Sequence, residues 1–175
     1  MATQPKFLNV TLDLTELRKL KKNLNKLKVY HNEWGWIDKA KYTAMDQHGR
    51  KGMYVAQIAF SNEYGDVIQS KDGKSINIPA RPYFFQSIPE AVKVNKQGVF
   101  DIALELLNNR PWLPTMNLVA EKSMKTLYQS IWKQNMTPLS PKTVDIKGNS
   151  YQWEDTGVLM GTIRYKTTKA KIKDN

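Results

Sequence analysis

Two prolines three positions apart constrain the middle of this 175-residue chain more than any other feature. Pro79 and Pro82 each fix φ at about −65° and lack a backbone N–H donor, so the segment from Ile78 to Phe85 is predicted to be extended and is not expected to form a central strand. Arg81 lies between the prolines, and three aromatic residues follow them. A stiff segment with one guanidinium group and an aromatic end suits contact with a large partner better than catalysis.

Length and composition predict one folded domain, spanning residues 1–175, that is large enough to bury a sizeable core. A hydrophobic content of 41% with five tryptophans and eight tyrosines argues against disorder. No apolar run approaches the ~20 residues that a membrane span needs. The first six residues lack the apolar core of a signal peptide, so an intracellular origin is expected. The absence of cysteine excludes disulfides and thiolate metal sites.

The net charge of +11 is concentrated at the two ends of the chain. Residues 1–28 carry seven basic and two acidic side chains, and residues 164–175 carry five basic and one acidic side chain. The ends therefore supply nine of the eleven net charges. This asymmetry is typical of termini that face a polyanion or an acidic protein surface. The alternative is a solvated helix face together with a solubilising tail at about 169–175.

A basic amphipathic helix is predicted at about 14–28. A short strand at 7–12 precedes it, Asp13 is expected to cap it, and Glu16 completes a capping-box-like start. Such a helix can lie on nucleic acid or a membrane, or its apolar stripe can pack on the domain core. The stripe comprises Leu14, Leu17, Leu20, Leu24 and Leu27.

The rest of the pattern predicts a single α+β domain, with a small antiparallel sheet packed against three or four helices. Ser87 is expected to cap the longest helix with Pro89 in its first turn, and Gly98 to weaken its middle. The remaining elements are a strand at 29–37, a helix at 54–63 ended by Gly65, a mobile loop or hairpin at 66–77, the long helix from 87 to about 109, a helix at 115–134, a loop at 136–150, a turn or short helix at 155–157 and a strand at 162–168.

The usual constellations of an enzyme are missing, and neither a catalytic site nor a cofactor or metal site is predicted. His31 and His48, the only histidines, are 17 residues apart and fit no metal-ligand spacing. No glycine-rich phosphate loop and no nucleophile elbow occur in the sequence. Trp34 and Trp36 could stack on the bases of a nucleic acid, with core packing as the alternative.

Several short motifs follow one another in a distinctive order. N-E-Y-G at 62–65 ends a predicted helix, and I-P-A-R-P-Y-F follows at 78–84. P-L-S-P-K-T at 138–143, K-G at 147–148, D-T-G-V-L at 155–159 and T-I-R-Y at 162–165 come later. This order, over about residues 29–168, resembles the tail-completion and neck proteins of the phage virion morphogenesis family.

The resemblance implies a structural virion protein rather than an enzyme. Such a protein assembles as a ring, with six copies expected, at the head–tail junction of a tailed bacteriophage. It completes the tail end and joins it to the head connector. The expected partners are further copies of the chain, head connector or adaptor proteins, tail tube or tail terminator proteins, and packaged DNA that passes the lumen without sequence recognition. No membrane partner is expected, and the location is the virion neck after synthesis in the host cytoplasm.

In a ring of this kind, the proline segment is expected to dock on the neighbouring subunit, with Arg81 paired to a carboxylate there. The alternative is that the segment packs on its own subunit and Arg81 pairs internally, for example with Glu63. The interface candidates are Ile78, Pro79, Arg81, Pro82, Tyr83, Phe84, Phe85 and Glu63. The candidates for facing DNA in the lumen are Arg18, Lys19, Lys22, Lys169, Lys171 and Lys173. The alternative function is nucleic-acid binding through the basic helix and the aromatic strand.

Overall fold

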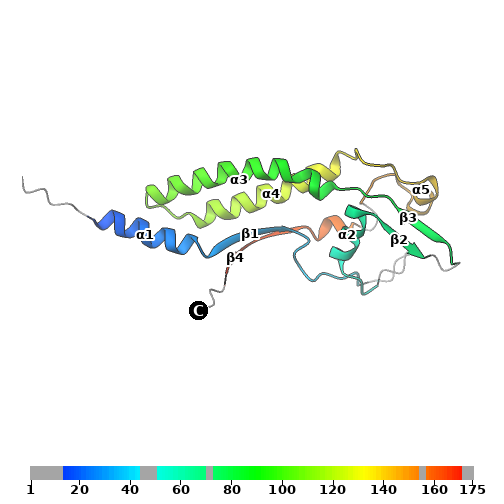
Figure 1. Cartoon of the computed structure of the whole chain (residues 1–175), viewed down its shortest axis with the longest axis horizontal. Helices are drawn as coiled ribbons and strands as arrows, with labels where there is room; N and C mark the ends of the chain where they lie inside the picture. Colours follow the sequence, from blue (N-terminus) through cyan, green and yellow to red (C-terminus); the bar gives the residue numbers. More distant parts are fainter. Residues whose placement is uncertain (1–13, 44–50, 70–72, 154–156, 171–175) are drawn as a thin grey trace, which may run out of the picture.

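Two long helices, α3 (Tyr83–Leu107) and α4 (Leu113–Trp132), lie side by side along most of the length of the elongated chain (Figure 1). The computed structural model describes residues 14–43, 51–69, 73–153 and 157–170. The apolar period predicted for the helix at 115–134, which corresponds to α4, is confirmed, since Met116, Val119, Leu127 and Ile131 are all buried. None of the helices in these ranges is long and apolar enough to cross a membrane.

Gly98 lies where α3 and α4 approach each other closely. A Cβ atom at this position would lie 2.2 Å from Cγ2 of Val119 on α4. Glycine is therefore the residue that allows the two helices to pack here, and its cost in helix propensity is outweighed by contact between the helices.

The strands form two separate antiparallel pairs. β1 (Tyr30–Gly35) pairs with β4 (Arg164–Lys169), and both strands lie against α4. β2 (Asp66–Gln69) pairs with β3 (Ser75–Ile78) and projects from the far end of the molecule in Figure 1. The predicted α+β class is confirmed, with its small antiparallel sheet divided into these two ribbons.

The helix α1 (Thr15–Leu27) is attached through only part of its leucine stripe. Leu20 and Leu27 pack against a small apolar cluster formed by Leu106, Trp112 and Met116. The other three leucines remain exposed, so the prediction that the stripe packs on the core holds for two of its five members. The predicted strand at 7–12 and the predicted cap Asp13 lie outside the described residues.

The main core gathers at the opposite end, where α2 (Val55–Tyr64), α6 (Val158–Gly161) and the start of α3 meet α4. Tyr83, Leu127 and Ile163 are its largest fully buried side chains. Gly65, with φ of +78°, ends α2 as predicted.

Two helix boundaries differ from the sequence prediction. The longest helix begins at Tyr83 instead of Ser87, so its three aromatic residues belong to the first helical turn and only the preceding prolines are extended. Ser87 donates a hydrogen bond to the carbonyl of Phe84 and Pro89 lies inside the helix. The stretch predicted as a loop at 136–150 contains α5 (Pro141–Lys147), capped by the side chain of Ser140.

Candidate functional site

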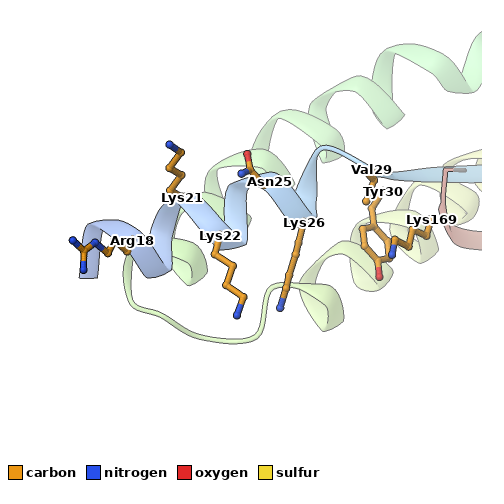
Figure 2. Close-up of a pocket in the computed structure, with 8 residues that line it drawn as sticks. All are labelled: Arg18, Lys21, Lys22, Asn25, Lys26, Val29, Tyr30 and Lys169. Atoms are coloured by element: carbon orange, nitrogen blue, oxygen red, sulfur yellow. The ribbon is translucent and has the colours of Figure 1, made fainter. Parts of the chain in front are cut away.

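An open groove of about 740 Å³ follows α1 to the point where the ends of the paired strands β1 and β4 meet (Figure 2). The antiparallel register places Lys169, at the end of β4, opposite Tyr30, which begins β1 shortly after α1 ends. Lys169 therefore joins the basic residues of α1 at one place in the fold. The groove is lined by Arg18, Lys21, Lys22, Asn25, Lys26, Val29, Tyr30 and Lys169.

The charge in this groove is uncompensated. Five of the eight lining residues are cations, and none of the eight is acidic. Among the described residues, none of these five cations has an ion-pair partner, whereas Lys19 on the same helix is bound to Glu16 at 2.8 Å. Unpaired like charges around one groove create a positive potential that attracts anions.

The cations follow the helix in regular steps. Arg18, Lys22 and Lys26 are spaced four residues apart, so each step advances about 6 Å along the axis of α1. Figure 2 shows Lys22 and Lys26 pointing to the side of the helix where the Tyr30 ring lies, while Lys21 points the other way. The row of positive charge is therefore extended rather than gathered around a point.

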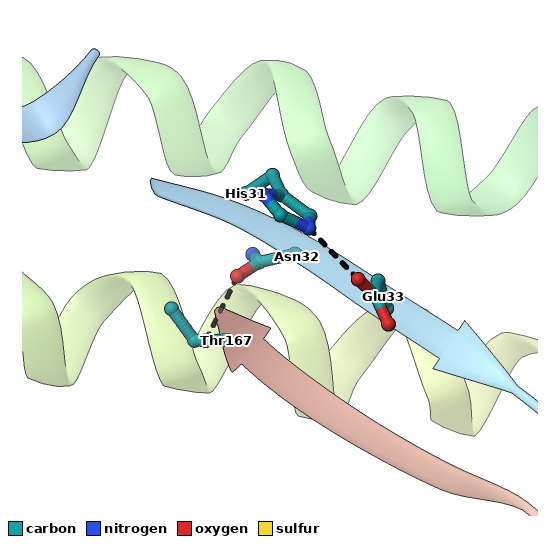
Figure 3. Close-up of polar contacts among 4 residues, drawn as sticks. All are labelled: His31, Asn32, Glu33 and Thr167. Carbon is teal, nitrogen blue, oxygen red and sulfur yellow. Dashed lines mark hydrogen bonds and ion pairs between the residues drawn. The ribbon is translucent and has the colours of Figure 1, made fainter. Parts of the chain in front are cut away.

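The aromatic ring beside the groove, that of Tyr30, packs against a second aromatic ring. Tyr30 meets Trp112 edge to face, with ring centroids 5.1 Å apart. Further along β1, the Asn32 amide donates to the carbonyl of Met116 on α4 at 3.0 Å. Its oxygen accepts from the hydroxyl of Thr167 on β4 at 2.8 Å, and on the exposed strand surface His31 and Glu33 are hydrogen-bonded (Figure 3). These contacts fix both strands against α4, so the groove has a rigid wall.

The structure brings together half of the residues predicted to face DNA. Arg18, Lys22 and Lys169 line the groove, Lys19 is paired with Glu16, and Lys171 and Lys173 lie outside the described residues. The sequence analysis missed the other five lining residues. Lys21 and Lys26 were in the charge count without being assigned to a site, Asn25 lies beside them on α1, and Val29 and Tyr30 lie where α1 is followed by β1.

Glu63, predicted at a subunit interface, instead holds the start of α3 in its own chain. Its carboxylate accepts hydrogen bonds from the backbone N–H groups of Phe84, at 3.0 Å, and Phe85, at 2.8 Å. These are two of the donors that a helix leaves unpaired in its first turn. The side chain is almost fully buried, and burial raises the pKa of Glu63 although the two backbone hydrogen bonds act to lower it.

This raised pKa predicts a specific dependence of stability on pH. Because folding favours the protonated carboxyl, the contribution of Glu63 is fully present below its ordinary pKa of 4.5 and is lost as pH rises through the raised value. We expect the free energy of unfolding of the wild type, minus that of Glu63→Gln, to fall as the pH is raised above 4.5 in urea titrations.

Glu90→Gln is the control for this experiment. The hydrogen bond from Lys93 lowers the pKa of Glu90, so the corresponding difference is fully present above pH 4.5 and falls only as the pH drops below that value. A Glu63→Gln difference that stays constant with pH, or that rises, contradicts the prediction.

Arg81 is an internal strut. Its side chain is only 5% exposed and donates to three backbone carbonyls: Nε to Thr137 at 2.9 Å, Nη2 to Pro138 at 3.2 Å and Nη1 to Pro79 at 3.4 Å. Burial lowers the pKa of the guanidinium. The structure supports the hypothesis that Arg81 is bonded within its own chain. The partner suggested for Arg81 is wrong, because the Glu63 carboxylate binds the start of α3 and not Arg81.

The rest of the proline segment is also used within the chain. Tyr83 is fully buried, and its hydroxyl donates to the side-chain oxygen of Gln152. Gln152 in turn donates to the carbonyls of Met136 and Thr137, so it joins this segment to the stretch that binds Arg81. Ile78, Pro79, Pro82 and Phe84 are half-buried. Among the eight interface candidates, Phe85 alone exposes most of its side chain, at 71%.

The aromatic strand does not offer its rings to a nucleic acid. Trp34 stacks on Phe84 with ring centroids 5.0 Å apart. Trp36 packs against Trp153 and donates its indole N–H to the carbonyl of Leu159 at 2.8 Å. The core-packing alternative is therefore confirmed for both tryptophans.

A second surface, which the sequence analysis did not identify, runs along α3. Its buried side faces α4, and its opposite side, here called the α3 outer face, is largely apolar and exposed. Spacings of three, four and seven residues relate the members on either side of the adjacent pair Val99 and Phe100, so the face is broad and covers nearly half of the helix circumference. They are Phe85, Ile88, Val92, Val99, Phe100, Leu104 and Leu107.

Comparisons with protein-family models, with curated proteins and with solved structures give no match to this chain. Within the described ranges, no group of three or more histidine, aspartate or glutamate side chains is placed to hold a metal ion. The basic groove and the α3 outer face are therefore the two surfaces that point to a function.

Proposed function

We propose that this chain is a structural protein of a tailed bacteriophage, which assembles as a ring at the head–tail junction, completes the tail end and joins it to the head connector. The α3 outer face is the observation that carries this proposal. A monomeric protein rarely exposes large apolar patches, which mark contacts with other proteins, and this face carries two of them, from Phe85 to Val92 and from Val99 to Leu107, on either side of Lys96. From Phe85 to Leu107, α3 offers this face over a length of about 33 Å.

The motifs behind the family resemblance support the proposal because they meet in space. Glu63 of N-E-Y-G binds the start of α3, and Arg81 of the proline segment binds the carbonyl of Pro138 in P-L-S-P. Leu159 of D-T-G-V-L accepts the indole hydrogen bond of Trp36. Segments that are distant in sequence are thus hydrogen-bonded to one another around the main core. These contacts give a structural reason for the motifs to occur together in one chain.

The position of Lys96 favours a ring over a twofold dimer. Lys96 lies near the middle of α3 and, at spacings of four from Val92 and three from Val99, on its outer face. Pairing of this face with itself across a twofold axis would bring two Lys96 side chains together. The face is therefore expected to contact a different surface of the next copy, and repeated contacts of that kind form a ring where the rotation between copies closes.

The test is the oligomeric state of the α3 outer-face variant Val92→Asp/Val99→Asp. Wild-type protein is expected to form closed rings in sedimentation velocity and negative-stain microscopy, and the variant is expected to remain a folded monomer. Leu118→Asp, an exposed apolar position on α4, is the matched control and should leave assembly unchanged. A wild type that stays monomeric at high concentration, also with connector and tail-tube proteins present, overturns the proposal.

The basic groove favours a second candidate, a nucleic-acid-binding protein that acts without a ring. The two candidates differ in how binding depends on salt. Binding to single-stranded DNA that survives about 0.5 M salt supports the second candidate, because purely electrostatic attachment is lost there.

A further inference from the structure

We infer that the basic groove between α1 and the β1–β4 pair binds the phosphate backbone of a nucleic acid without reading its sequence. The groove is complete within a single chain, so this inference does not depend on ring assembly. It assigns a ligand to residues, Lys21, Lys26, Asn25 and Tyr30 among them, that the sequence analysis left without a role.

The cations of the groove are not needed to hold α1 in place. The helix is attached through Leu20 and Leu27, and none of its residues is fully buried. The lining cations make no ion pairs with other described residues, and their mutual repulsion disfavours bringing them together. A bound polyanion would remove that repulsion, and release of its counterions would favour binding.

The dimensions of the groove suit a chain of phosphates. From Arg18 to Lys26 the helix advances about 12 Å, a length over which one strand of a DNA duplex presents three or four phosphates. Lys169 extends the positive charge beyond the end of the helix toward β1. A single small anion would need a compact cluster of donors instead of this row.

The chemistry of the lining favours phosphate and sugar contacts. Arginine, lysine, asparagine and tyrosine are the side chains that commonly donate to phosphate oxygens, and all four types line the groove. No acidic residue lines it, although carboxylates accept hydrogen bonds from cytosine in sequence-specific readers. We therefore expect affinity without sequence preference.

The experiment measures fluorescence anisotropy of a labelled mixed-sequence duplex of roughly 30 base pairs as the full chain is added over a series of salt concentrations. Lys22→Gln/Lys26→Gln removes two groove charges from exposed positions, so its melting temperature should equal that of the wild type. We expect it to bind at least about tenfold more weakly at low salt and to reduce the slope of log K against log salt by about 2.

The matched control is Lys133→Gln/Lys142→Gln, which removes the same charge from exposed positions near the other end of the molecule. It should retain nearly all of the affinity and slope. Equal weakening by both variants, or no binding by the wild type at low salt, overturns the inference. Displacement of the labelled duplex by poly-glutamate at a lower concentration of charge than unlabelled duplex requires also overturns it, because the groove would then prefer an acidic protein.

The same titration with Val92→Asp/Val99→Asp separates this inference from the proposed function. Duplex binding by that monomeric variant supports the groove assignment whether or not the wild type forms rings. Loss of binding in that variant, with its fold intact, would mean that the groove alone is insufficient, and it overturns the inference while leaving ring assembly standing.

Discussion

Replacing Arg81 with alanine is expected to lower the free energy of unfolding by about 3 kcal/mol. The guanidinium serves three backbone carbonyls in an interior site, and each carbonyl left without a donor costs about 1–3 kcal/mol. Part of this loss is offset because the substitution also removes a charge that is buried without a carboxylate partner. Urea titrations followed by far-ultraviolet circular dichroism and by tryptophan fluorescence measure the difference.

Two variants make this result specific. Arg81→Lys keeps the charge but replaces the planar fork with a single ammonium group, so an intermediate loss is expected. Arg110→Ala removes an exposed arginine from the connection between α3 and α4 and should change stability by less than about 0.5 kcal/mol. If Arg81→Ala unfolds at the wild-type urea concentration yet fails to assemble, Arg81 acts between subunits and the internal strut is wrong.

The elements predicted well are those whose signals are local. The apolar period of α4 is set by residues three and four apart, and the end of α2 by Gly65 with its positive φ. The strands at both ends of the domain followed from short apolar and aromatic runs. In each case the sequence signal that predicts the element lies within a few residues of chain, although the strands themselves pair over a long distance in sequence.

The start of α3 was placed wrongly because its cap comes from another helix. Ser87 followed by Pro89 has the local form of a helix start, and no residue before Tyr83 supplies a capping side chain. The carboxylate of Glu63 takes that role from the end of α2. A sequence pattern read along the chain contains no signal for a capping residue about 20 positions away.

The groove was predictable in its charge but not in its geometry. Counting lysines and arginines identified both basic ends, while the pairing of Tyr30 with Lys169 that joins them connects the first strand to the last. The α3 outer face could not be predicted from the sequence, for a related reason. Apolar residues occur on both sides of α3, and only the packing of α4 against one side shows which of them remain exposed.

The close approach of α3 and α4 at Gly98 predicts that Gly98→Ala lowers the stability of the fold. In an isolated helix Gly98→Ala would be stabilising by about 0.8–1.0 kcal/mol. Here the new methyl group would meet Cγ2 of Val119 at 2.2 Å and Cγ1 at 2.9 Å. Overpacking of this kind costs about 1–3 kcal/mol, so we expect a net loss of stability of up to about 2 kcal/mol in place of the gain. Gly161→Ala is the control, because no atom lies within 4 Å of the added methyl group there.

A double-mutant cycle identifies the cause of that loss. Val119→Ala removes both clashing methyl groups and alone should destabilise the fold by about 1–3 kcal/mol through a cavity between α3 and α4. In Gly98→Ala/Val119→Ala the new methyl group fills part of that cavity, so the double variant is expected to be more stable than the sum of the single effects by about 1–3 kcal/mol. Additive effects would mean that α3 and α4 separate instead of clashing. The α3 outer face would then move with the helix, and assembly of the Gly98→Ala variant should fail before its fold does.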